Sequence, residues 1–310
     1  MLREQHEKKK SSHSAQNDVA IFPTECTIPL QHDRANFNLL YDWGVMQTTR
    51  IQLAVAAVCC LLAFPAASAF GQSTNDDQVI EQARKSYYNL HDAGLKGFRC
   101  DVRVDWDAAL RAMKTDEAAR EQLLPLLRQM HFEVAMGPGG APEISRRFDG
   151  TPPDEQAMQR LRAATGRFEQ MLGEFFQEWS MFAFGPPLPS TTQNYRLEQA
   201  GDDLHITVRS DPVVFETLNK DYAIEEVAFA EQHSTATMRP QFKRGEKGYI
   251  PTVLDSNIAA AGADEIKNHV EIAYQNMEGF SLPQTVSVQS TQPAGDVRVQ
   301  FSFENYQITK

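Results

Sequence analysis

The stretch 270-VEIAYQNMEGFSLPQTVSV-288 decides the fold, because it holds two strand-like runs separated by a short break. Val270 and Ile272 alternate with polar residues, which is the period of a strand with one buried face. Pro283 has no backbone N–H to donate to a neighbouring strand. We therefore expect residues 279–283 to join two antiparallel strands, with Pro283 at the start of the second strand.

Further strands are predicted on both sides of this stretch. The run that ends the chain alternates at Val297, Val299, Phe301 and Phe303, and its apolar phase then slips to Tyr306 and Ile308. A β-bulge near residues 304–305 would return both positions to the same face. Residues 195–197 and 204–208 read as a hairpin around a Gly-Asp turn, and 223–242 and 248–259 are weaker strand candidates. The last third of the chain therefore reads as an antiparallel sheet.

The region upstream mixes helices with two more strands. We expect a helix over 77–95, a strand over 98–106 with Cys100 in its apolar series, and a helix over 108–130 that Pro125 kinks or restarts. A second strand is expected over 132–136. The longest helical signal begins at Thr151 or Asp154 and presents an aromatic stripe, composed of Leu161, Phe168, Leu172, Phe175, Trp179 and Phe182.

These elements together predict an α+β fold. We expect a curved antiparallel sheet, bent by bulges and prolines into an open half-barrel, with helices covering its concave side. Residues 70–310 are expected to form a single domain with a helical insertion around 108–182. A chain of this length can bury about 70% of the surface that its unfolded form exposes.

The first 69 residues have a different character. Residues 46–69 contain Arg50, an apolar run over 53–64, and Ala67 and Ala69 at the small positions that a signal peptidase requires, so we expect a cleaved signal peptide. Residues 1–45 are expected to be a non-native or disordered extension, which leaves Met1 and Met46 both open as translation starts. The alternative is a membrane anchor over 51–70, a length that just spans a bilayer.

The charge and cysteine content narrow the class of partner. Residues 1–69 carry six basic and six acidic residues, so the remainder keeps the whole net charge of −11. Such an acidic surface repels phosphate backbones, which argues against a nucleic-acid partner. Cys100 is the only cysteine after residue 69, so the exported part has no internal disulfide. We expect a periplasmic or secreted protein that is stabilised by its hydrophobic core.

No familiar catalytic pattern occurs in residues 70–310. Their five histidines are scattered, and we find no HExxH, Cys-His cluster, GxSxG or phosphate-binding glycine loop. Adjacent carboxylates such as Asp202-Asp203 are common in so acidic a chain and are read as solvated surface. We therefore expect no catalytic residue, no metal, no cofactor and no enzymatic activity.

The export signal, the leading helix, 97-GFRCDVRVDW-106 and the ending HVEIAYQNMEGFSLPQTVSVQST…GDVRVQFSFENYQI resemble the outer-membrane lipoprotein carrier superfamily. The resemblance is one of strand and turn pattern and covers about half of residues 70–310, at their two ends. It implies an unclosed antiparallel barrel whose cavity takes acyl chains. Arg99 and Arg103 lie on the strand that corresponds to the first strand of the carriers, and neither matches the carriers' functional arginine uniquely.

Two functions follow from these observations. One is an exported protein that binds an acyl chain or other hydrophobic ligand in the half-barrel, in lipid or lipoprotein trafficking. The candidate lining residues are aromatic and aliphatic side chains of the long helix and the following loop: Phe175, Trp179, Phe182, Phe184 and Leu188. The other is a non-enzymatic cell-envelope interaction or scaffold protein, in which the same aromatic stripe packs a solid core. The sequence leaves the oligomeric state open.

Overall fold

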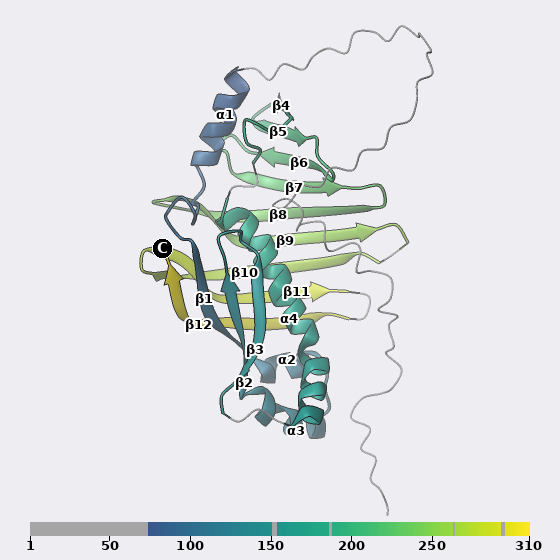
Figure 1. The fold of residues 1–310 in the computed structure, drawn as a ribbon. Coiled ribbons are helices and arrows are strands. Elements are labelled where there is room, and N and C mark those ends of the chain that lie inside the picture. The colour runs from purple at the N-terminus through teal and green to yellow at the C-terminus, as the bar shows by residue number, and fades with distance from the viewer. Residues whose placement is uncertain (1–73, 151–153, 186–187, 263, 293–294) are drawn as a thin grey trace, which may run out of the picture. The chain divides into compact units, whose positions relative to one another are not determined.

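The structure, a computed structural model, describes residues 74–150, 154–185, 188–262, 264–292 and 295–310, and within them it has four helices and twelve strands (Figure 1). The helices are α1 (Thr74–Lys85), α2 (Trp106–Ala112), α3 (Glu117–Leu127) and α4 (Glu155–Ala183). The strands are β1 (Gly97–Val104), β2 (Met130–Met136), β3 (Pro142–Phe148), β4 (Tyr195–Ala200), β5 (Asp203–Val208), β6 (Val213–Leu218), β7 (Ile224–Ala230), β8 (Ser234–Gly245), β9 (Gly248–Ala260), β10 (Ile266–Met277), β11 (Phe280–Thr291) and β12 (Val297–Thr309). The expected extension, signal peptide, cleavage site at Ala67 and Ala69, and alternative anchor over 51–70 lie outside the described residues.

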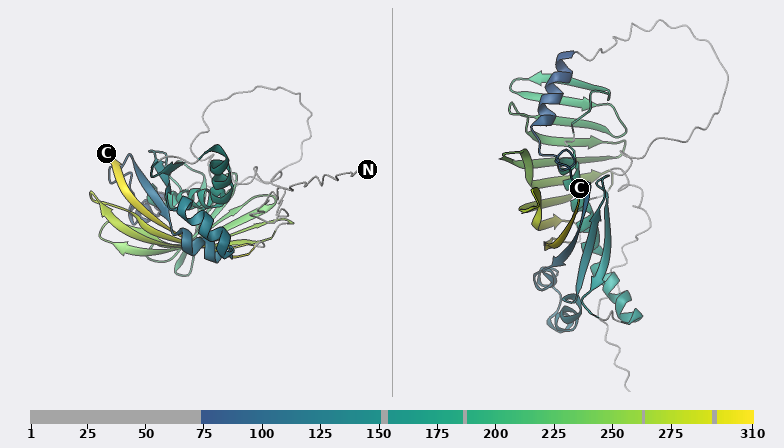
Figure 2. Two further views of the ribbon diagram at one scale, coloured as in Figure 1. Left: turned by 90° about the horizontal axis from the view of Figure 1, so that it is seen from below. Right: turned by 60° about the vertical axis from the view of Figure 1, so that its left-hand side comes forward.

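All twelve strands form one antiparallel sheet in the order β3-β2-β1-β12-β11-β10-β9-β8-β7-β6-β5-β4. Strands β4 to β12 follow one another as a meander, and β12 then pairs with β1, so the two ends of the domain meet inside the sheet. The sheet curves without closing, and β3 and β4 are its edges (Figure 2). The expected α+β class with a curved antiparallel sheet is confirmed.

The stretch 270–288 is a hairpin, as predicted, but its turn is shorter than expected. Glu278 and Gly279 alone form the turn, both with positive φ (52° and 92°), and β11 already begins at Phe280. Pro283 lies within β11, where the pairing with β10 shifts register next to Tyr274. The placement of Pro283 at the start of the strand was wrong because a bulge provides another position where a missing N–H is tolerated.

The bulge expected near residues 304–305 is present. The pairing of β12 with β1 shifts register between Arg99 and Asp101, and Asn305 adopts a positive φ of 53°. Phe303 is buried on one side of the bulge, and Tyr306 on its other side packs against the same core. The bulge therefore keeps the apolar series of β12 on one face.

The first helix ends ten residues before the predicted position. Tyr87 forms a parallel bridge with Tyr249 at the start of β9, and the amide of Tyr249 donates to the carbonyl of Ser86 at 2.8 Å. Gly248 permits this approach: a Cβ there would lie 2.7 Å from the Ser86 carbonyl oxygen. Pairing with the sheet thus replaces the helical hydrogen bonds that the residue pattern alone favoured.

The helix expected over 108–130 is two helices. Asp105 caps α2, so Trp106 begins a helix rather than ending a strand, and Asp116 caps α3 through the amide of Ala119 at 2.9 Å. Pro125 lies inside α3 and is not the break. The range 108–182, expected as a helical insertion, also contributes β2 and β3 to the sheet.

The strand expected over 132–136 is β2, and the hairpin of β4 and β5 is as predicted. Two strands were missed. In β3 the inward positions are Ile144, Arg146 and Phe148, and in β6 they are Val214, Glu216 and Leu218. A charged side chain at the centre of each inward series conceals the alternation. The candidate strand over 223–242 is divided between β7 and β8.

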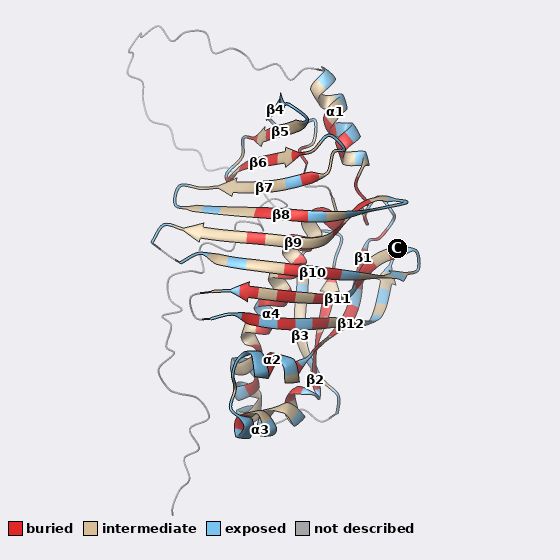
Figure 3. Cartoon of the chain, turned by 180° about the vertical axis from the view of Figure 1, so that it is seen from behind, coloured by how far each residue is buried: buried red, intermediate tan, exposed pale blue. Residues whose placement is uncertain are grey.

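Helix α4 packs on one face of the sheet, with its aromatic stripe in the main core (Figure 1). Asp154 is its N-cap, one of the two starts expected, and accepts from the amide of Ala157 at 2.8 Å. Buried residues are dense along the middle of β11 and β12, whereas one end of β7 to β10 is intermediate or exposed (Figure 3). The core lies between α4 and the strands β1, β2 and β9 to β12, and it continues beneath α1 along β5 to β8.

Candidate functional site

The five predicted ligand-lining residues lie together at the C-terminal half of α4 and just after it. Phe175, Trp179, Phe182 and Leu188 are buried, with at most 4% of each side chain exposed, and Phe184 is half-buried. The ring of Trp179 stacks on Phe175 with centroids 6.3 Å apart and meets Phe184 edge-on at 5.8 Å. Phe182 contacts Phe242 of β8 at 5.6 Å. The residues pack on one another and on the sheet.

A short hydrogen-bond chain anchors this cluster to the sheet. The indole N–H of Trp179 donates to the hydroxyl of Tyr274 at 3.0 Å, and that hydroxyl donates to the carbonyl of Pro251 at 2.6 Å. Burial raises the pKa of the Tyr274 hydroxyl, so the group stays neutral. The polar end of the buried indole is thus satisfied inside the core, as a buried tryptophan requires.

Beside the aromatic stripe, α4 presents a polar seam to β9 and β10, defined here as Glu174, Glu178, Ser256 and Asn268. The Ser256 hydroxyl donates to a carboxylate oxygen of Glu178 at 3.1 Å, and Ser256 pairs with Asn268 across the two strands. Glu174, one helical turn before Glu178, accepts from Gln170 at 2.8 Å. Glu174, Glu178 and Asn268 line a recess of about 10 Å³, which has room for about one water.

The two carboxyls of the seam are in an environment that favours their neutral forms. Burial raises the pKa of Glu178 to about 7, the hydrogen bond from Ser256 opposes the shift, and the charge of Glu174 adds to it. Burial likewise raises the pKa of Glu174, while its hydrogen bond from Gln170 and the charge of Arg167 oppose the shift. Buried acids with raised pKa values, next to a recess, are a common feature of binding sites.

A third buried acid lies under α1. Glu216 of β6 is 2% exposed, and neither carboxylate oxygen has a hydrogen-bond partner among the residues the structure describes. Burial raises its pKa well above the usual range, and the nearby Arg84 opposes that shift. The Arg84 guanidinium instead donates to the carbonyl of Leu188 at 2.6 Å. The environment of Glu216 therefore favours the neutral form of its carboxyl.

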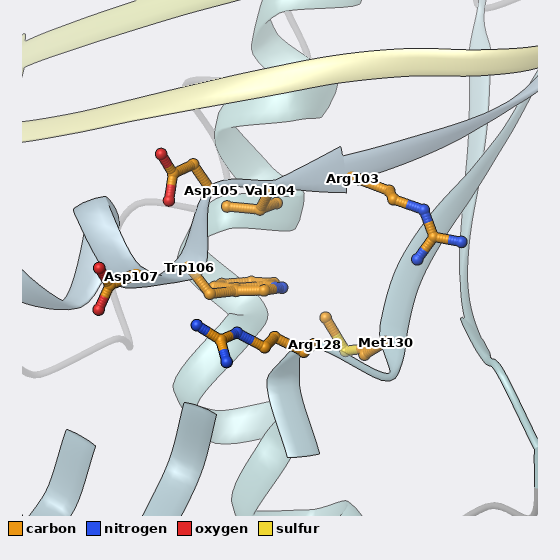
Figure 4. Close-up of a pocket in the computed structure, with 7 residues that line it drawn as sticks. All are labelled: Arg103, Val104, Asp105, Trp106, Asp107, Arg128 and Met130. Carbon is orange, nitrogen blue, oxygen red and sulfur yellow. The ribbon is translucent and has the colours of Figure 1, made fainter. Parts of the chain in front are cut away.

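A separate cleft of about 230 Å³ opens where β1 passes into α2 (Figure 4). Its lining includes Trp106, which is 4% exposed and whose indole N–H has no partner in the described part of the chain. Arg128, at the end of α3, and Met130, at the start of β2, form another wall. An open recess of about 400 Å³ lies at the other end of β1, beside Arg99 and Met136.

Arg99 and Arg103, the two arginines on the strand that resembles the first strand of the carriers, lie on the face of β1 opposite Cys100. Each is engaged by acids: Arg99 with Glu133 at 3.0 Å and Arg103 with Asp149 at 2.9 Å. Cys100 is 1% exposed, and burial raises the pKa of its thiol to about 12, which confirms it as a core residue.

Sequence reasoning missed the buried acids, although two of them left a signal. Glu178 stands three residues after Phe175 and four before Phe182, so it falls within the aromatic stripe of α4. Glu216 alternates with Val214 and Leu218, in the apolar phase of its strand. A charged residue at a core position of a regular pattern is the sequence mark of such a site. The cleft at Trp106 has no such signal in the sequence, because it forms between two chain reversals that are brought together only by the pairing of β1 with β2.

No group of three or more histidine, cysteine, aspartate or glutamate residues that could hold a metal occurs in the described ranges. None of the helices in those ranges is both long and apolar enough to cross a bilayer. Comparison of the chain with models of known protein families, with characterised proteins and with solved structures finds no match. The resemblance to the lipoprotein carriers stays a prediction from the sequence.

Proposed function

We propose that this chain is an exported, non-enzymatic protein that binds an acyl chain or similar apolar ligand between α4 and the concave side of the half-open sheet, in lipid or lipoprotein trafficking. The signal-like segment over 46–69 supports export. The curvature of the sheet in Figure 2 supports a trough, which α4 would cover from its concave side. Entry requires α4 to move, because the aromatic stripe fills the space beneath it.

The observation that carries the proposal is the polar seam. A helix that only filled a core would be apolar towards the sheet, since an ionised carboxylate in the interior is strongly unfavourable. Here Glu178, which holds Ser256 by a hydrogen bond, lies at the edge of an aromatic surface and lines a recess. An apolar surface with a few convergent polar groups is the usual composition of a small-molecule site. The polar seam would bind the polar end of the ligand, and the aromatic stripe would contact the acyl chain of the ligand.

A second function is supported by a different observation. Phe175, Trp179 and Phe182 are at most 1% exposed and make close ring contacts. Such packing favours the alternative, an envelope interaction or scaffold protein with a solid core.

One experiment separates the two. The full chain, purified from its native compartment without detergent, is extracted with organic solvent and analysed by mass spectrometry, and we expect about one lipid per protein. In parallel, the indole N–H signals are followed by NMR during titration with 16-doxyl stearate. A ligand beneath α4 broadens the Trp179 signal much more than that of Trp106. An empty extract together with no saturable broadening would establish the solid core instead.

A further inference from the structure

The cleft beside Trp106 is built by two neighbouring chain reversals. Strand β1 ends at Val104 and α2 begins at Trp106, with the side chain of Asp105 capping the helix through the amide of Ala108 at 3.1 Å. Helix α3 ends at Leu127, and β2 begins at Met130. Because β1 and β2 are adjacent in the sheet, the two reversals face each other and leave the cleft between them.

Trp106 packs against aromatic side chains from two other elements. Its ring meets Phe168 of α4 edge-on with centroids 5.0 Å apart and lies 6.5 Å from the ring of Phe132 of β2. In Figure 4 the nitrogen end of the ring points toward the side of the cleft where Arg103 and Met130 lie. A buried indole N–H nearly always has an acceptor, and leaving it without one costs about 1–3 kcal/mol. For packing alone, phenylalanine would fill the position without that penalty.

All the charged side chains that line the cleft have a partner, except one. Asp107 pairs with Arg111 at 2.5 Å, and Asp105 is used as the helix cap. Arg103 pairs with Asp149 at 2.9 Å. Arg128 is exposed, and its guanidinium has no hydrogen-bond or ion-pair partner among the described residues. The cleft therefore offers one unpaired cation and one unpaired N–H donor.

We propose that this cleft binds a small organic monocarboxylate, whose oxygens pair with the Arg128 guanidinium and accept from the Trp106 indole N–H. The long, exposed Arg128 side chain can follow the ligand, and its planar guanidinium matches a carboxylate. The apolar body of the ligand lies against the Trp106 ring and Met130, a flexible side chain that can uncover the N–H by changing rotamer. The cleft has a volume of about 230 Å³.

The same charges discriminate between anions. Arg128 is the one unpaired cation of the cleft, and Asp105 and Asp107 are also in the lining. Only one of the two negative charges of a phosphate dianion would therefore be neutralised. In Figure 4 the two aspartate carboxylates lie at the opposite end of the cleft from the indole nitrogen. A monoanion that keeps to the nitrogen end avoids their repulsion, whereas a neutral isostere gains nothing from Arg128.

The test uses NMR of the indole N–H groups in the full chain, with signals assigned by Trp106→Phe and Trp179→Phe, during titration with sodium benzoate. We expect a saturable shift of the Trp106 signal alone. Arg128→Gln, a surface change, should weaken benzoate binding about tenfold or more. The control Arg244→Gln, which removes an exposed arginine of β8 that does not line the cleft, should leave binding within about twofold.

Benzyl alcohol, the neutral analogue, and inorganic phosphate serve as competitors, and both should bind much more weakly than benzoate. The proposal is overturned if benzoate produces no saturable Trp106 shift, if Arg128→Gln binds as the unaltered chain does, or if benzyl alcohol or phosphate binds as tightly as benzoate. These results are independent of the doxyl stearate titration, which reports on the space beneath α4.

Discussion

The indole N–H of Trp179 and the hydroxyl of Tyr274 form a 3.0 Å hydrogen bond that joins α4 to β10. The same hydroxyl donates a hydrogen bond to the carbonyl of Pro251 in β9. One tyrosine therefore satisfies polar groups on two other elements. Trp179 and Pro251 are buried and Tyr274 is partly buried, so removing the hydroxyl leaves two buried neighbours without this partner.

Tyr274→Phe should therefore lower the free energy of unfolding by about 1–3 kcal/mol, measured by urea denaturation. Combined with Trp179→Phe, the double variant should lose about 1 kcal/mol less than the sum of the two single losses, because each change removes the same bond. Strictly additive losses would mean that the bond contributes nothing of its own to stability.

The acids of the seam predict how stability depends on pH. Burial raises the pKa of Glu178 from its ordinary 4.5 to about 7, so the folded state holds this proton more tightly than the unfolded chain does. The free energy of unfolding should then fall as pH rises from about 4.5 to about 7, by up to about 3 kcal/mol. The raised pKa values of Glu174 and Glu216 act in the same direction.

Glu178→Gln should flatten this dependence, which urea denaturation at pH 5 and pH 7.5 would measure. The matched control is Glu225→Gln, an exposed acid on β7, and it should keep the pH dependence of the unaltered chain. An equal slope in Glu178→Gln and the unaltered chain would place the titrating group elsewhere.

Glu216 offers a stabilising substitution. Its two orphaned oxygens are enclosed by the core, and methionine has a similar volume without a polar atom. We expect Glu216→Met to raise the free energy of unfolding at pH 7 by about 1–3 kcal/mol. Glu225→Met, on the surface, should change it by less than about 0.5 kcal/mol. A loss of stability in Glu216→Met would reveal that the carboxyl has a partner that the folded chain needs.

Gly248 tests how the first helix is terminated. An alanine there would bring its Cβ within 2.7 Å of the Ser86 carbonyl oxygen and 2.8 Å of Tyr87 backbone. Gly248→Ala should therefore lower the melting temperature clearly more than Gly262→Ala. Gly262 also has a positive φ, but no atom lies within 4 Å of an added Cβ, so that control isolates the backbone strain that both share.

The sequence allowed prediction of those elements whose pattern is local. The hairpin of β10 and β11 and the bulge at Asn305 follow from alternation that neighbouring residues display. The end of α1 did not, because Tyr249, 162 positions after Tyr87, supplies the pairing that stops the helix. Likewise β3 was missed because the charged residue Arg146 occupies an inward position in that strand. Its guanidinium is hydrogen-bonded there to Thr165 of α4. Contacts between distant segments decide such cases.

The same distinction applies to the candidate site. The aromatic stripe of α4 is visible in the sequence, so Phe175, Trp179 and Phe182 were expected to lie together. Whether such a stripe lines a cavity or fills a core depends on the residues that face it. Those residues lie on β9 and β10, which are distant from α4 in the sequence and meet it only in the folded chain. The role of Ser256 against Glu178 belongs to that wall and had no local signal.

The last prediction concerns the movement of α4 that the proposed ligand binding requires. Arg146 of the edge strand β3 donates to the hydroxyl of Thr165 at 3.1 Å and pairs with Glu169, both on α4. Arg147, the next residue, points to the other side of β3 and pairs with Glu133 of β2 at 2.8 Å. The two arginines therefore offer matched substitutions, of which only one releases the helix.

If α4 is a cover that opens, Arg146→Met should favour the open state by about 1 kcal/mol, which is about a fivefold change in its population. Amide hydrogen exchange should then accelerate about fivefold over the first half of α4, and uptake of cis-parinaric acid, followed by stopped-flow fluorescence, should quicken by a similar factor. Arg147→Met loses an ion pair of the same kind without touching α4 and should leave both rates unchanged. Equal rates in the two variants would show that α4 stays in place as part of a fixed core, and the alternative of a scaffold protein would then be preferred.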